Sequence, residues 1–152
     1  MQIAPDDLSG PEIAEFLHEH LRQMYALSPP ESVHALDLDA LRAPGVTFWS
    51  VRDEDGVVGC GALKRLDAGH AELKSMRTRP ARQRGGIASR LLAHIIGEAT
   101  AAGFTRLSLE TGSDDAFLPA RALYAKFGFT VCEPFADYRP DPNSTFMTRT
   151  LG

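Results

Sequence analysis

The basic run between Lys74 and Arg90 is the part of the sequence whose residue types and spacing most directly suggest chemistry. Every charged residue in it is basic, and a Gly85-Gly86 step precedes an apolar helical pattern. A tight glycine turn that leads a strand into a helix leaves backbone N–H groups unpaired, and the helix dipole adds partial positive charge there. Such a turn binds phosphate well. Two interpretations remain open: a helix N-terminus with basic side chains, or a binding site for a compact polyanion.

The spacing within this turn differs from that of two common phosphate-binding motifs. No GK[ST] follows it, and it is not a GxGxxG turn with an acidic residue about 20 residues further on. It reads Gln83-x-x-Gly86-x-Ala88. Other parts of the chain must therefore decide between the two interpretations.

The elements that would position the turn follow from apolar periodicity and from turn residues. Helical spacing predicts helices at 6–27, 36–45, 87–101 and 114–128. Strand-like runs predict three antiparallel strands within 46–78, separated by DEDG and DAGH, and further strands at 104–111, 129–135 and 145–151. The basic turn thus joins a strand to the helix at 87–101.

The segment SMRTRPARQRGGIASRLL resembles the pyrophosphate-binding motif, Q/R-x-x-G-x-G/A, of the GNAT superfamily of acyl-CoA-dependent N-acyltransferases. In the preceding strand, Glu72 lies eleven positions before Gln83, where the family's fourth strand carries an acidic residue. The segment ARALYAKFGF resembles the family signature A-x-x-L-Y-x-x-x-G-F, with Tyr124 in the usual tyrosine position. The order of elements is similar to that of the family across nearly the whole chain.

The resemblance implies an α+β fold. We expect a central, mostly antiparallel twisted sheet of six to seven strands, flanked by about four helices and splayed between its fourth and fifth strands. Residues 1–152 are expected to form a single N-acetyltransferase domain. A chain of 152 residues, 43 % of them apolar, is long enough to bury one core.

The resemblance also implies acetyl-CoA as cosubstrate, with no metal. Backbone N–H groups of Met76, Arg77 and Thr78 would pair with the pantetheine arm like an added strand, and that of Met76 would polarise the acetyl carbonyl. The pyrophosphate would lie on the loop formed by Gln83, Arg84, Gly85, Gly86, Ile87, Ala88 and Ser89, with unspecific attraction from nearby basic side chains. The chain departs from the family pattern at Arg84, where many members have glycine, and at Phe117, where many have asparagine.

Tyr124 and Glu72 are the candidate catalytic residues that the resemblance implies. Tyr124 would protonate the leaving thiolate, a role suited to a phenol, although its helical pattern alone favours a core tyrosine. Glu72 would act as the base, through water, on an ammonium acceptor, and its alternative is an exposed strand carboxylate. Glu110, at the end of the next strand, is the second candidate for the base. No cysteine lies in the motifs, so we expect direct transfer in a ternary complex.

The acceptor is expected to be a primary amine of a small molecule or peptide. In this fold the first helical segments and the loop before the last strand usually select it. The possible lining residues are Tyr25, Phe135, Asp137, Tyr138, Asp141 and Asn143. A well-packed proline loop is an equal alternative for the second segment, and an acyl-CoA-binding sensor without turnover is the alternative for the whole protein.

The composition argues against other partners. A net charge of −4 opposes nucleic-acid binding, and no apolar run approaches the roughly 18 residues of a membrane span. The N-terminus has no basic or apolar leader pattern. Cys60 and Cys132 lack CxxC spacing and are interpreted as core thiols in the reduced cytoplasm.

Two further expectations concern the histidines and the oligomeric state. His18 and His20 are two residues apart on a helix, so they cannot face one ligand and are expected at the surface. His34 and His70 are expected in loops without partners. Exposed strand edges near the C-terminus allow a homodimer.

Overall fold

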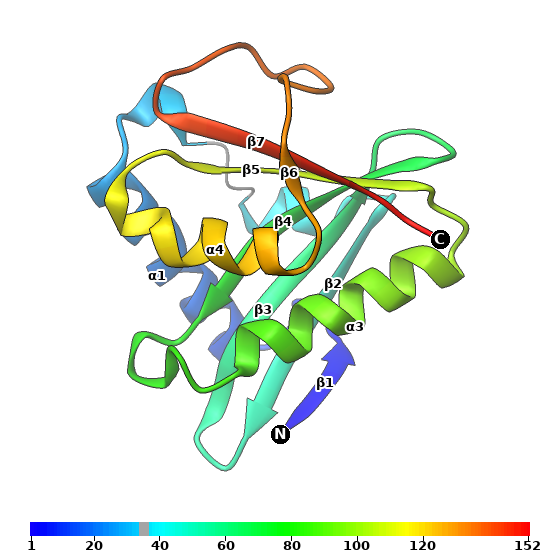
Figure 1. Cartoon of the computed structure of the whole chain (residues 1–152). Helices are drawn as coiled ribbons and strands as arrows, with labels where there is room; N and C mark the ends of the chain where they lie inside the picture. Colours follow the sequence, from blue (N-terminus) through cyan, green and yellow to red (C-terminus); the bar gives the residue numbers. More distant parts are fainter. Residues whose placement is uncertain (34–36) are drawn as a thin grey trace.

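The computed structural model describes residues 1–33 and 37–152, which build one twisted sheet (Figure 1). Within these residues the strands follow the order β1-β2-β3-β4-β5-β7-β6, with β4 and β5 parallel and the other neighbours antiparallel. The strands are β1 (Gln2–Pro5), β2 (Val46–Asp53), β3 (Gly56–Arg65), β4 (His70–Thr78), β5 (Arg106–Gly112), β6 (Thr130–Val131) and β7 (Ser144–Thr150). The expected mixed, mostly antiparallel sheet is confirmed.

Helices cover both faces of this sheet (Figure 1). They are α1 (Pro11–Leu27), α2 (Leu38–Leu41), α3 (Ile87–Ala101) and α4 (Leu118–Lys126), with short 3-10 turns at Pro30–Ser32, Pro80–Arg82 and Asp115–Phe117. On one face, α3 and α4 pack around a core that includes Leu91 and Leu107. On the other, α1 and α2 pack around Ile13 and Phe48. None of the described helices is long and apolar enough to cross a membrane.

The first ten residues differ from the sequence prediction. Gln2–Pro5 pair with β2 as an edge strand that is too short for its pattern to stand out in the sequence. The helix expected from Asp6 begins only at Pro11. The Asp6 carboxylate accepts a hydrogen bond of 2.8 Å from the N–H of Leu8, whose φ is +65°, and this turn is incompatible with a helix. Proline suits the first helical position, where its missing N–H is not needed.

The two helices predicted for 36–45 and 114–128 are both shorter than expected. The helix predicted for 36–45 is a single turn, α2, capped by the Asp37 carboxylate on the N–H of Ala40 at 2.9 Å. The Asp114 carboxylate caps the 3-10 turn before α4 in the same way, through the N–H of Ala116 at 2.9 Å. Leu36, in the predicted helix, and His34 lie outside the described residues.

The strand predicted for 129–135 is reduced to β6, Thr130–Val131. Pro134 has no N–H with which to continue the ladder. Cys132 therefore lies just beyond a short edge strand and is only half-buried, which corrects its assignment to the core. Cys60 is buried in β3, as predicted.

The parallel pair β4 and β5 is joined along only part of its length. Their ladder ends at the pair Leu73–Leu109, although β4 continues to Thr78 and β5 to Gly112. The ends of the two strands diverge, which confirms the expected splay between the fourth and fifth strands.

A bulge in β4 lies beside this splay. Ser75 and Met76 stand opposite a single β3 residue, Gly61, and Ser75 has φ +57°. The Cys60 thiol donates a hydrogen bond to the Ser75 carbonyl at 3.2 Å. A Cβ on Gly61 would lie 2.7 Å from the Met76 sulfur and 2.9 Å from the end of Ile95, so glycine allows this close packing. The described ladders pair Met76 with neither β3 nor β5.

Candidate active site

A cavity of about 640 Å³ opens where β4 and β5 diverge. Its walls come from the C-terminal half of α1, the second half of β4, the turn before α3, the end of β5 and the first turns of α4. Segments far apart in the sequence, including those singled out by their motifs, therefore meet at one place.

Most residues predicted to contact the coenzyme line this cavity. They are Met76, Arg77, Thr78, Gln83, Arg84, Gly86, Ile87, Ala88 and Ser89. Gly85 belongs to the predicted set but does not line the cavity. The three candidates for acid–base roles, Tyr124, Glu72 and Glu110, line the same cavity.

The turn before α3 has backbone geometry suited to an anion. Gly86 is the N-cap of α3 with φ +86°, and no side chain caps the helix. The first N–H groups of α3 therefore lack intrahelical partners and are available to a ligand. No heavy atom lies within 4 Å of a Cβ built on Gly86, so the dihedral angle is what favours glycine. Arg84 adopts φ +66° without being glycine, a conformation that costs about 1–2 kcal/mol.

The acidic turn between β2 and β3 neutralises part of the basic run. Arg82 forms ion pairs with Asp53 at 2.6 Å and with Asp55 at 3.1 Å. Arg79 donates a hydrogen bond of 3.2 Å to the backbone carbonyl of Asp55. The attraction for phosphate expected from basic side chains is therefore reduced at these two positions, whereas Arg84 is exposed.

Glu72 lies within a buried polar network and is not the exposed strand carboxylate that was its alternative. It is 3 % exposed, and its Oε2 accepts hydrogen bonds from Lys74 Nζ at 3.1 Å and from the Tyr138 hydroxyl at 2.6 Å. Lys74 Nζ also donates to the Tyr138 oxygen at 2.8 Å. Burial, and then the charge of Glu72, raise the pKa of Tyr138, so this phenol stays protonated.

Glu110 is the carboxyl whose protonation the site alters most. Burial raises its pKa from 4.5 to about 7. The nearby Ser144 hydroxyl and the charge of Lys74 oppose this rise, whereas the charges of Glu72 and Asp141 add to it. A carboxyl that is about half ionised near neutral pH suits general base catalysis.

Tyr124 is a buried tyrosine that nevertheless reaches the cavity. It is 7 % exposed, and its ring meets Phe129 edge-on with centroids 5.8 Å apart. Burial, with the nearby charge of Glu110, raises the pKa of its hydroxyl. The phenol is therefore fully protonated at neutral pH and can donate a proton, and its packing explains why it also fits the pattern of a core residue.

Phe117, which departs from the family pattern, also lines the cavity. A Cβ added to Gly112, at the end of β5, would lie 2.2 Å from the Phe117 ring. Arg121 donates a hydrogen bond of 2.6 Å to the Gly112 carbonyl. These contacts hold the start of α4 against β5.

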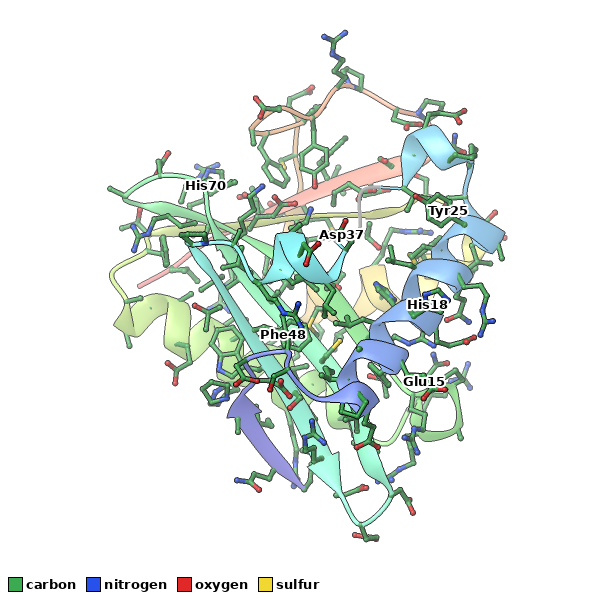
Figure 2. All side chains as sticks on the ribbon, turned by 180° about the vertical axis from the view of Figure 1, so that it is seen from behind. Glu15, His18, Tyr25, Asp37, Phe48 and His70 are labelled. Atoms are coloured by element: carbon green, nitrogen blue, oxygen red, sulfur yellow. The ribbon has the colours of Figure 1, made fainter. Side chains whose placement is uncertain are left out.

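Two of the histidines differ from their sequence predictions. His18 is exposed on α1, as expected (Figure 2), but His20 is 6 % exposed and lines the cavity. Burial, and then the charge of Arg77, lower the pKa of His20 to about 4, so it is neutral. His70 begins β4, and its Nε2 lies 2.7 Å from the Ser108 hydroxyl, so it has a partner. Among the described residues no group of three or more potential ligands could hold a metal ion.

Several predicted acceptor-lining residues have other positions. Tyr25 is 55 % exposed near the end of α1 and does not line the cavity (Figure 2). Phe135 and Asp137 do not line it either. Tyr138 does not line the cavity; it packs edge-on against Phe135 and donates a hydrogen bond to Glu72.

Asn143 is the predicted acceptor residue that does line the cavity. Its amide lies 3.4 Å from the Ser32 hydroxyl, which in turn donates a hydrogen bond of 2.7 Å to Asp141. The loop before β7 is thereby tied to the segment after α1. From that first segment, apolar side chains that include Met24 and Leu27 line the cavity, and sequence reasoning had not singled them out.

Comparison with known proteins agrees with this architecture. Residues 13–129 match the model of the acetyltransferase (GNAT) family. The chain is 56 % identical over 151 residues to the uncharacterized N-acetyltransferase YsnE of Bacillus subtilis, covering 99 % of this chain and 100 % of that one. It is 41 % identical to an IAA acetyltransferase of Azospirillum brasilense, covering 91 % and 90 % of the two chains.

Solved structures show the same fold. A crystal structure of an aminoglycoside 6'-N-acetyltransferase complexed with coenzyme A superposes with a TM-score of 0.71 at 16 % identity, covering 99 % of this chain and 97 % of that one. The family match, the named relatives and the shared fold lead to one conclusion. The chain belongs to the acetyltransferase (GNAT) family and is an acyltransferase.

Proposed function

We propose that this protein transfers the acetyl group of acetyl-CoA directly to a primary amine of a small molecule or peptide. The observation that carries the proposal is one cavity in which the first turn of α3, the unpaired bulge of β4, Tyr124 and Glu110 meet. A phosphate-binding turn, a strand edge, an acid and a base are the groups that acyl transfer from a thioester requires. Relatives named as N-acetyltransferases support the choice of an amine as acceptor.

Backbone groups hold the coenzyme in this proposal. The N–H groups at the start of α3 and in the turn from Gln83 to Ser89 bind the pyrophosphate. The backbone of Met76 to Thr78 pairs with the pantetheine arm as an added strand, because the splay leaves this part of β4 without β5 as a neighbour. The N–H of Met76 then donates to the thioester carbonyl and stabilises the negative charge that develops on its oxygen.

Glu110 and Tyr124 move the protons. Glu110 accepts a proton from the ammonium form of the acceptor, directly or through water. The free amine attacks the thioester carbon, so that a C–N bond forms as the C–S bond breaks. Tyr124 donates its proton to the departing sulfur, so that the coenzyme leaves as the free thiol. The attacking nitrogen loses its remaining extra proton to water as the amide forms, and the Tyr124 phenolate takes a proton back from water.

Glu72 remains the other candidate for the base. Both carboxyls line the cavity, but Oε2 of Glu72 already accepts hydrogen bonds from Lys74 and Tyr138, whereas Glu110 has a pKa of about 7. This difference favours Glu110 as the proton acceptor and Glu72 as the group that holds Lys74 in place.

Neither cysteine is suited to carry the acetyl group. Burial raises the pKa of Cys60 to about 12, and burial also raises the pKa of Cys132. A thiol is an effective nucleophile as its thiolate, so both groups are poorly activated. This supports direct transfer. We also retain the proposals of a single domain over 1–152, a cytoplasmic setting and a possible homodimer.

A thiol-release assay tests the proposal. Purified protein is mixed with acetyl-CoA and a panel of amino acids, simple amines, polyamines, aminoglycosides and short peptides, and free coenzyme A is measured. Amine-dependent release is the expected result. Tight binding of acetyl-CoA with no release across the panel would favour the sensor without turnover.

A further inference from the structure

Arg77 lines the cavity on the side of α1 without an acidic partner. Its guanidinium carbon lies 5.4 Å from the centre of the Phe16 ring, and one terminal nitrogen donates to the side-chain oxygen of Gln23. Its Nε has no hydrogen-bond partner among the described residues. Within the same residues, no Asp or Glu forms an ion pair with Arg77 or shifts its pKa. Burial lowers the pKa of this arginine, which reflects the cost of its uncompensated charge.

Two of the other described cations that line the cavity are paired with acidic residues, and the third, Arg84, is exposed in the turn before α3. Lys74 is paired with Glu72, and Arg82 is paired with Asp53. Neighbouring His20 is neutral at physiological pH and adds no positive charge. A half-buried guanidinium with unused donors binds a carboxylate readily, because it can donate two parallel hydrogen bonds to it. The charge of Arg77 is therefore available to a ligand.

We infer that the acceptor is an amino-carboxylate: an amine that also bears a carboxylate, which Arg77 binds while the amino group faces Glu110. This inference rests on the proposed acetyl transfer. Apolar side chains on the same side of the cavity, Met24, Leu27 and Val33, suit an acceptor with an apolar body. Amino acids with aliphatic or aromatic side chains fit this description. Polyamines and aminoglycosides fit it poorly, because they would bring several positive charges to Arg77.

A phosphate of the coenzyme is the other anion that could reach Arg77. The side chain, however, turns towards Phe16 and Gln23 on α1, whereas the free N–H groups that suit phosphate lie at the start of α3. The two anions can be told apart by substituting Arg77. If it binds the acceptor carboxylate, its loss weakens binding of the acceptor; if it binds a coenzyme phosphate, its loss weakens binding of acetyl-CoA.

The experiment compares matched ligands, such as leucine with leucinamide and phenylalanine with phenylalaninamide. Calorimetry in the presence of coenzyme A measures binding, and thiol release measures turnover. The acid should exceed its amide by about 10- to 100-fold in both affinity and kcat/KM. Arg77→Met should reduce this preference to less than about threefold. It should leave the KM for acetyl-CoA unchanged, because it removes only the side chain and keeps the backbone that is proposed to pair with the pantetheine arm.

Two further variants separate binding from folding. Gln23→Glu places a carboxylate next to Arg77, which should compete with the acceptor and abolish the preference for the acid without lowering the melting temperature. Arg22→Met, at a side chain 67 % exposed on the same helix, should keep the wild-type preference.

The outcomes distinguish the inference from the function on which it rests. Turnover of amines with no preference for the acid, a preference that survives both Arg77→Met and Gln23→Glu, or a raised KM for acetyl-CoA in Arg77→Met would each overturn the inference. Binding of the acid through Arg77 with no thiol release would uphold the carboxylate site and contradict the proposed acetyl transfer.

Discussion

Tyr138 donates a hydrogen bond of 2.6 Å to Oε2 of Glu72, a residue 66 positions earlier in the chain. Lys74 donates to both groups, so the three side chains form a closed, largely buried network. The contact fastens the loop before β7 onto the first half of the sheet. It also adds a hydrogen bond to the buried ion pair of Glu72 and Lys74, in which loss of either partner would leave an uncompensated buried charge.

Tyr138→Phe should destabilise the protein by about 1–3 kcal/mol, because the buried Glu72 carboxylate loses one of its hydrogen bonds. Urea denaturation followed by fluorescence or circular dichroism measures the change. The matched control is Tyr25→Phe, at a tyrosine 55 % exposed, which should stay within about 0.5 kcal/mol of the wild type. Equal stability of the two variants would show that the network contributes little.

The pH dependence of turnover should identify the base. If Glu110 must be ionised, kcat/KM should rise with pH through a pKa of about 7. Glu110→Gln should lower kcat/KM about 100-fold or more and remove this part of the profile. Glu72→Gln is the comparison, and it should retain the inflection near pH 7. Loss of the inflection in Glu72→Gln alone would assign the base to Glu72.

The Glu110 carboxyl should also make the stability of the folded protein depend on pH. The pKa of Glu110 is raised by folding from 4.5 to about 7, so the folded protein binds more protons than the unfolded chain between these values. Its contribution is thus most favourable below pH 4.5 and is lost as the pH rises to about 7. The stability of Glu110→Gln relative to wild type should therefore increase between pH 5 and pH 8, measured by urea denaturation across this range. A difference that does not change with pH would contradict the raised pKa.

Features that depend on contiguous residues could be predicted from the sequence. The local order of glycines and apolar residues determines the geometry of the turn from Gln83 to Ser89, which we propose binds the coenzyme through its backbone. The predicted acidic cap at Asp114 is equally local, because its carboxylate accepts a hydrogen bond from the nearby N–H of Ala116. The mostly antiparallel sheet and its splay followed from the resemblance of the whole pattern, whereas the edge strand β1 did not.

Features that depend on distant segments were missed. Arg82 pairs with Asp53, and Tyr138 pairs with Glu72. In each pair the two residues lie far apart in the chain, and no sequence pattern links them. The burial of His20 did have a signal. It follows Ile13 and Leu17 at the spacing of one helical face, and all three are buried in α1.

Substituting alanine for Gly86, the N-cap of α3, and for Gly97, inside the helix, should change stability in opposite directions. Gly86→Ala places a side chain at φ +86°, so it should destabilise the fold by about 1 kcal/mol and weaken coenzyme A binding. Gly97→Ala, within the same helix and with no heavy atom within 4 Å of the new Cβ, should stabilise it by about 0.5–1 kcal/mol. Thermal unfolding and calorimetry with coenzyme A measure both effects. Undiminished coenzyme binding in Gly86→Ala would contradict the assigned role of the turn.

Tyr124→Phe should lower kcat at least tenfold with little change in acetyl-CoA binding, because the ring keeps its packing against Phe129 while the proton donor is lost. Steady-state kinetics and calorimetry separate the two effects. Unchanged turnover at every pH would remove Tyr124 from the proton transfer.

The most direct measurement is a stoichiometric one, in which free coenzyme A and acetylated amine are quantified together, with mass spectrometry of the protein at each time point. Direct transfer predicts equal amounts of thiol and amide, no acetyl group on the protein, and a parallel fall of both products in Tyr124→Phe. Acetylated protein formed before the amine is added, or thiol released without amide, would contradict it.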